Sequence, residues 1–169
     1  MNRLNISRIA LLLSLLLPVI GLPADEDIAW IADANGCKVA NPFPQTGETI
    51  TWSGVCKNKL ANGEGVLVWT VNGKIADRYE GSLVMGWAEG KGTLTREEGR
   101  YSGDWKHSLQ DGTGRFDAAD GSWYEGQWMN GQPHGQGRYR SADGKLLEGE
   151  WMDGEFQGDL GGDDNPNRV

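Results

Sequence analysis

The feature that most constrains this chain is a short motif that recurs at a nearly fixed spacing. Its glycine lies at Gly81, Gly103, Gly126 and Gly149, so successive copies are 22, 23 and 23 residues apart. A Gly-x-Gly pair follows each of the first three copies, at Gly90/Gly92, Gly112/Gly114 and Gly135/Gly137. A period in the twenties is typical of a stacked array, in which each unit buries its apolar face only against its neighbours.

The best-formed unit indicates that each copy forms strands. In Tyr124-x-Gly126-x-Trp128 the two rings and the glycine alternate with polar residues, so they should share one face of a strand. Gly135-x-Gly137-x-Tyr139 alternates in the same way, and its bare backbone leaves room for rings of the neighbouring strand.

Tight turns separate these strands. Asn-Gly and Asp-Gly pairs are strong hairpin signals because such turns need positive φ, and they occur at Asn72-Gly73, Asp120-Gly121, Asn130-Gly131, Asp143-Gly144 and Asp153-Gly154. Since no helical segment lies between the hairpins, we expect an all-β fold, an elongated single-layer antiparallel sheet of consecutive hairpins on the order of 50 Å long.

These motifs resemble a known repeat. Tyr79-Glu-Gly, Tyr124-Glu-Gly-Gln-Trp-Met-Asn-Gly-Gln-Pro-His-Gly-Gln-Gly and Leu147-Glu-Gly-Glu-Trp-Met-Asp-Gly are similar to the MORN consensus Tyr-Glu-Gly-x-Trp-x-x-Gly-x-x-His-Gly-x-Gly. The resemblance covers about residues 50–160, as four or five units, and implies scaffolding or dimerisation, with lipid binding as a further option. The stretch from Gly36 to Cys56 also looks like the cysteine-bearing lead-in of some exported bacterial MORN proteins.

The first units depart from the pattern. Trp52 takes the Tyr position of the first unit, and Cys56 and Leu83 take the Trp position of the first and second units. The first unit is also four or five residues longer than the others, and we expect residues 71–78 to absorb the excess as a longer hairpin loop.

The N-terminus has the pattern of a secretion signal. Arg3 and Arg8 precede an apolar run over residues 9–17, Pro18 breaks it, and small residues follow. An uncleaved N-terminal anchor is the alternative. We therefore predict a signal peptide over 1–24, a lead-in or cap over 25–49, the repeat array over 50–160 and a flexible tail over 161–169, in an exported protein that is periplasmic or secreted.

The predicted export determines how the two cysteines are interpreted. Cys37 and Cys56 are an even count in an oxidising compartment, so we predict a disulfide that ties the lead-in to the first unit. A redox pair is the alternative, but the intervening 18 residues are unlike a Cys-x-x-Cys motif.

Charge and residue types exclude several functions. Without the first 24 residues the chain has 14 basic and 24 acidic residues, a net charge of −10, which opposes nucleic acid and anionic lipid. His107 and His134 are the only histidines, and the latter occupies the repeat's own His position. The recurring Glu80, Glu125 and Glu148 should be about 10 Å apart, too far to share a proton or one ion. We expect no catalytic residue, metal or cofactor.

The aromatic row is the candidate binding face. It comprises Trp52, Tyr79, Tyr101, Trp105, Tyr124, Trp128 and Trp151. Two outcomes remain open, because the rings can line an exposed groove or be buried under the lead-in and a dimer partner. The leading hypothesis is a non-catalytic protein–protein interaction or scaffolding module that binds a protein or itself, and the alternatives are a cell-wall glycan or a zwitterionic lipid.

Overall fold

The computed structural model describes residues 28–158, in which every element of regular secondary structure is a strand. The predicted signal peptide at 1–24 and tail at 161–169 lie outside the described residues. The strands are β1 (Ala29–Ala32), β2 (Lys38–Asn41), β3 (Glu48–Trp52), β4 (Val55–Lys57), β5 (Leu60–Val71), β6 (Lys74–Val84), β7 (Trp87–Arg96), β8 (Gly99–Lys106), β9 (Leu109–Ala118), β10 (Trp123–Met129), β11 (Gln132–Arg140), β12 (Leu146–Met152) and β13 (Glu155–Gly158).

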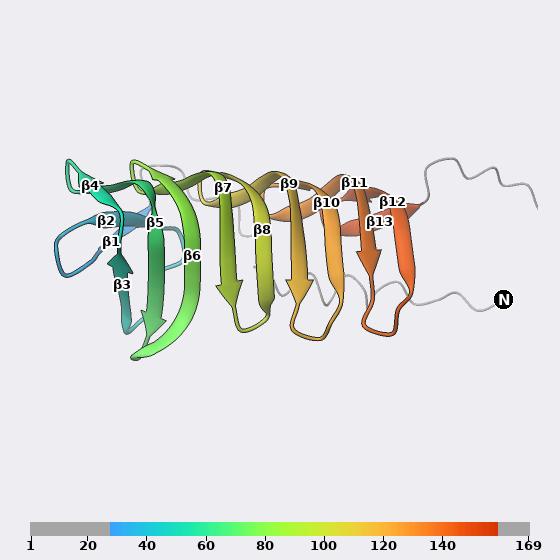
Figure 1. The fold of residues 1–169 in the computed structure, drawn as a ribbon, viewed down its shortest axis with the longest axis horizontal. Helices are drawn as coiled ribbons and strands as arrows, with labels where there is room; N and C mark the ends of the chain where they lie inside the picture. Colours follow the sequence, from blue (N-terminus) through green and yellow to red (C-terminus); the bar gives the residue numbers. More distant parts are fainter. Residues whose placement is uncertain (1–27, 159–169) are drawn as a thin grey trace, which may run out of the picture.

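The strands form one elongated sheet. From β5 to β13 each strand pairs antiparallel with the next one in the sequence, so the sheet is a meander of hairpins (Figure 1). Within the described range one strand pair is parallel, the single contact of Lys38 in β2 with Leu60 in β5. The predicted single-layer array of consecutive hairpins is confirmed.

A row of glycines crosses the sheet at its middle. Each glycine is paired in register with the next one, and the row runs through Gly65, Gly81, Gly92, Gly103, Gly114, Gly126, Gly137 and Gly149, one from each strand between β5 and β12. Register shifts directly follow this row in three hairpins, between Gly81 and Ser82, Gly103 and Trp105, and Gly126 and Trp128. Such bulges bend a strand, and the upper strand ends in Figure 1 accordingly curve to the back of the view.

The curved ends carry five tight turns, which we call the tips: residues 58–59, 85–86, 107–108, 130–131 and 153–154. Both residues of every tip have positive φ. The second residue of each later tip donates its N–H to a carbonyl in the preceding hairpin: Gly86 to Ala61, Ser108 to Ala88, Gly131 to Gln110 and Gly154 to Pro133, at 2.8–3.0 Å. These hydrogen bonds at the tips therefore connect each unit to the one before it.

The prediction for the longer first unit is wrong. Asn72 and Gly73 form a tight turn, and the extra residues lengthen β5 and β6 instead of a loop. A register shift between Trp69 and Thr70, in the pairing of β5 with β6, accommodates the difference in length that remains between the two paired segments. The extra backbone is thereby hydrogen-bonded to a neighbouring strand, whereas a long loop would leave it unpaired.

The lead-in covers the first units from behind. Figure 1 shows the β1–β2 hairpin in blue behind β5, running across the strands of the array. The predicted Cys37–Cys56 disulfide is present, with the two Cα atoms 5.7 Å apart, and it ties this hairpin to β4. Within residues 28–158 there is no helix with the length and apolar character needed to cross a membrane.

Candidate interaction site

The aromatic residues of successive units form one continuous ladder. Ring centroids are 5.2 Å apart for Tyr79–Trp105, 5.2 Å for Trp105–Tyr101, 5.0 Å for Tyr101–Trp128, 5.2 Å for Trp128–Tyr124 and 5.1 Å for Tyr124–Trp151, all edge to face. Edge-to-face pairs at this distance add about 0.5–1.5 kcal/mol beyond the area they bury. Every internal ring thus contacts a ring of its own unit and a ring of a neighbouring unit.

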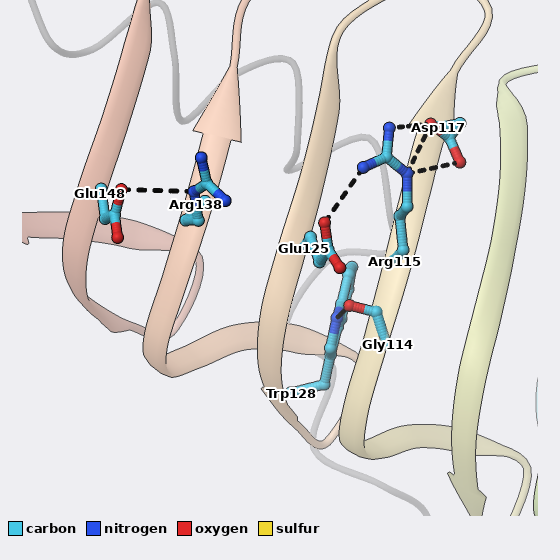
Figure 2. A network of polar contacts seen from close by, with 7 residues as sticks. All are labelled: Gly114, Arg115, Asp117, Glu125, Trp128, Arg138 and Glu148. Carbon is cyan, nitrogen blue, oxygen red and sulfur yellow. Dashed lines mark hydrogen bonds and ion pairs between the residues drawn. The ribbon is translucent and has the colours of Figure 1, made fainter.

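Hydrogen bonds fix the rings to the glycine row. The indole Nε1 of Trp105, Trp128 and Trp151 donates to the carbonyls of Gly92, Gly114 and Gly137, at 3.1, 3.0 and 3.2 Å. Figure 2 shows Trp128 reaching across to Gly114 of the preceding strand. Since a buried indole N–H needs an acceptor, each tryptophan fastens its unit to the previous one.

The tyrosines point their hydroxyls at carbonyls of their own strand. Tyr79, Tyr101 and Tyr124 donate to the carbonyl three residues ahead, at 3.1, 2.9 and 2.9 Å. Burial raises the pKa of these three phenols well above its ordinary value, because the phenolate would be desolvated. Nearby carboxylates add to the rise for each of them.

The first unit keeps this arrangement with a different ring. Trp52 donates its Nε1 to the carbonyl of Val55, also three residues ahead, at 3.0 Å. Its ring covers Gly65 as the tyrosine rings cover the later glycines. Trp52 therefore acts as the tyrosine of the first unit.

The structure resolves whether the predicted aromatic row is exposed or buried in the single chain. The seven residues are buried, at most 8% exposed: Trp52, Tyr79, Tyr101, Trp105, Tyr124, Trp128 and Trp151. They belong to the buried hydrophobic core of the array. Of the seven, Tyr79 and Trp105 also line the groove described next.

An apolar groove of about 660 Å³ lies between the lead-in, the sheet and the tips. Leu67, Trp69 and Leu94 line it on one side, and Leu109 and Met129, which directly flank the third and fourth tips, line it on another. Residues 39–43 of the lead-in form a further wall. The volume is within the range of ordinary ligand sites.

Sequence reasoning missed these groove residues. Trp69 and Leu94 belong to the halves of β5 and β7 beyond the glycine row, outside the aromatic motif of the repeat. Leu94 alternates with the polar residues Thr93 and Thr95, which was an available signal. Trp69 gives no such signal, because it follows the unbroken apolar run at residues 66–68.

The charged groups of the groove are mostly acidic. Among the lining residues that the structure describes, Glu48, Asp77 and Asp153 are acidic and Arg96 alone is cationic. Arg96 Nη2 lies 3.3 Å from Asp77 Oδ2. Desolvation raises the pKa of Asp77, although the positive charge of Arg96 opposes that rise.

The opposite face of the sheet carries a polar trough of about 1000 Å³, floored by the glycine row from Gly65 to Gly126. The recurring glutamates lie on this face and pair with arginines: Arg115 Nη1 with Glu125 at 3.2 Å and Arg138 Nε with Glu148 at 3.3 Å, both shown in Figure 2, and Arg78 with Glu80. Exposed pairs of this kind contribute little to stability. The recurring glutamates therefore form ion pairs with arginines on a solvated face.

His107 lies in the third tip, and His134 lies in β11, a few residues after the fourth tip. His134 Nδ1 is 3.6 Å from Asp153 Oδ1 of the next tip, and His107 Nδ1 is 3.5 Å from Glu89 Oε1. Within residues 28–158 no group of three or more histidine, cysteine, aspartate or glutamate side chains is placed to hold a metal ion.

The comparison with protein families agrees with this geometry. The MORN repeat model matches four consecutive segments, residues 57–74, 79–99, 101–123 and 124–145. The chain therefore belongs to the MORN-repeat family, as the sequence motifs predict. No curated protein matches the chain. MORN repeats are in general binding modules without catalytic activity.

Proposed function

We propose that this chain is an exported, non-catalytic interaction module that holds a segment of a protein partner in the groove between lead-in, sheet and tips. The observation that carries the proposal is the placement of apolar side chains. The rings of the aromatic ladder are buried in the core and are not available to a partner. Trp69, Leu109 and Met129, in contrast, line the groove, which is open to solvent. A recess lined by apolar residues and rimmed by charges is the usual form of a recognition site.

Export is part of the proposal. The basic and apolar pattern of residues 1–24 favours it, and the Cys37–Cys56 disulfide is compatible with an oxidising compartment. A disulfide at this end also braces the lead-in, which forms one wall of the groove.

The burial of the rings disfavours a glycan partner on the aromatic row. Stacking on sugar rings needs an exposed aromatic face, and Trp105 and Trp128 are 6% and 3% exposed. A protein segment needs no such face, because side chains of its own can enter the apolar recess.

Position-resolved photocrosslinking in the native compartment tests the proposal. A photoreactive residue replaces Leu109 or Met129 in the groove, and Thr93 or Gln127 in the polar trough provides the matched control. We expect a protein adduct from the groove positions alone, and we expect the captured protein, once purified, to bind the wild-type chain but not Leu109→Arg. Adducts that form equally from both faces, or from the trough only, would contradict the proposal.

A further inference from the structure

Strand β2 of the lead-in donates backbone hydrogen bonds to the first two tips, and the later tips have the same kind of acceptor. Lys38 N–H donates to the carbonyl of Lys59 at 2.9 Å, and Ala40 N–H donates to the carbonyl of Gly86 at 3.0 Å. Lys59 and Gly86 are the second residues of the first and second tips. β2 therefore crosses from one tip to the next within two residues, and it uses the N–H groups of alternate residues.

The side chains of β2 are oriented accordingly. Val39, which lies between the two donating residues, is 1% exposed and belongs to the hydrophobic core. One part of β2 thus forms hydrogen bonds to the tips and another part fills the apolar interior, as in a strand added to the edge of a sheet.

Proline ends this pattern at the third tip. The next alternate residue after Lys38 and Ala40 is Pro42, which has no N–H to donate. The chain then turns away and returns to β3. The carbonyl of Ser108 in the third tip consequently receives no hydrogen bond from β2.

The later tips present the same acceptors as the first two. The second tip has φ of 50° and 85°, the third 48° and 62°, and the fourth 51° and 83°. Their second residues, Ser108 and Gly131, both line the groove. Among residues 28–158 we find no hydrogen-bond donor to the carbonyl of either residue.

We propose that the groove binds an extended, basic segment of a protein partner, which continues the path of β2 by donating N–H groups of alternate residues to the carbonyls of Ser108 and Gly131. The intervening side chains enter the recess at Leu109 and Met129. The basic charge follows from Glu48, Asp77 and Asp153, which exceed Arg96 in number, and from the net charge of −8 of the whole chain. The same charge disfavours a second copy of the chain as the occupant. This inference rests on the proposed function and specifies the partner segment.

A designed peptide tests the inference apart from the identity of the natural partner. The probe is a short synthetic peptide of alternating lysine and valine, capped at both ends, added to the full chain in its exported, disulfide-bonded form. Backbone amide chemical shifts locate its site. We expect shifts at residues 108–110 and 130–132, and none in the polar trough at Thr93, Ser102 or Thr113.

Three relatives of the probe supply the decisive contrasts. N-methylation of one alternate set of residues should weaken binding roughly tenfold, since two backbone hydrogen bonds are lost, and methylation of the other set should have less effect. A peptide with glutamate in place of lysine should bind more weakly than the probe. Asp153→Asn, which keeps a residue tolerant of positive φ, should weaken lysine–valine binding, whereas Glu155→Gln outside the groove should not.

Equal effects of the two methylated sets, equal binding of the glutamate peptide, or shifts confined to the trough would each overturn the inference. Those results would leave the proposed function intact if photocrosslinking still captured a partner from the groove, for example as a helix. Loss of the groove adducts would instead remove both proposals.

Discussion

Gly114→Ala is the change that examines the packing of the array most sharply. Gly114 lies in the glycine row between Gly103 and Gly126, and a Cβ atom at this position would be 2.3 Å from Tyr101 Oη and 2.5 Å from Tyr101 Cζ. Carbon atoms in favourable contact are about 3.5–4.0 Å apart. The tyrosine ring would therefore have to move by roughly 1 Å.

The surroundings of Tyr101 oppose that movement. The ring is 1% exposed and lies edge to face with both Trp105 and Trp128, at 5.2 and 5.0 Å. Its hydroxyl donates to the carbonyl of Asp104 at 2.9 Å. Overpacking costs about 1–3 kcal/mol and loss of the hydrogen bond about 0.5–1.5 kcal/mol, so we expect a destabilisation of about 2–4 kcal/mol.

Urea unfolding followed by tryptophan fluorescence measures this change, and a double-mutant cycle isolates its cause. In a Tyr101→Leu background the branched side chain no longer extends over Gly114, so Gly114→Ala should cost less than about 1 kcal/mol there. A cost below about 0.5 kcal/mol in the wild type, or an equal cost in both backgrounds, would refute the packing argument.

The remaining predictions concern ionisation, the disulfide and the tips. The raised pKa of Tyr79, Tyr101 and Tyr124 contributes stability that is fully present below the unfolded pKa near 10 and is lost as pH rises further, because the unfolded chain then binds fewer protons. An alkaline spectrophotometric titration should show phenols that ionise only when the sheet unfolds, and ionisation of all four tyrosines near pH 10 in the folded protein would contradict this. Replacing Cys37 and Cys56 by serine should cost about 3 kcal/mol in the chain-entropy account, and hydrogen exchange should accelerate more in the first unit than in β11–β13; uniform acceleration would argue against a local brace. Gly131→Val places a β-branched residue at φ +83° and should cost about 1–2 kcal/mol, whereas Gln136→Val on the exposed side of β11 should change unfolding by less than about 0.5 kcal/mol.

The repeating part of the fold could be predicted from the sequence because its signal is periodic. Tyr124, Gly126 and Trp128 share a face by simple alternation, and their spacing recurs from unit to unit. The pairing of Gly114 with Gly126 and of Gly126 with Gly137 follows once consecutive hairpins are accepted.

Other parts could not be predicted because they depend on contacts between distant segments. The sequence shows that the first unit has extra residues, but its length is the same whether these form a loop or extend the strands. The pairing of β5 with β6 through Trp69 places them in the strands. The burial of Trp105 depends on Tyr79 and Tyr101 from two units. The path of β2 is set by two carbonyls, on Lys59 and Gly86, that no local pattern marks. The groove is formed by the same long-range contacts, so its lining was not apparent in the motif.

Trp105, Trp128 and Trp151 each connect their unit to a glycine carbonyl of the preceding unit. Hydrogen exchange of the indole N–H groups, resolved in ¹H–¹⁵N spectra, tests this connection directly. We expect slow exchange for Trp105, Trp128 and Trp151, whose indole N–H groups donate to glycine carbonyls, and fast exchange for Trp30, which is 42% exposed. Exchange of the three ladder indoles at the rate of Trp30 would contradict the connection.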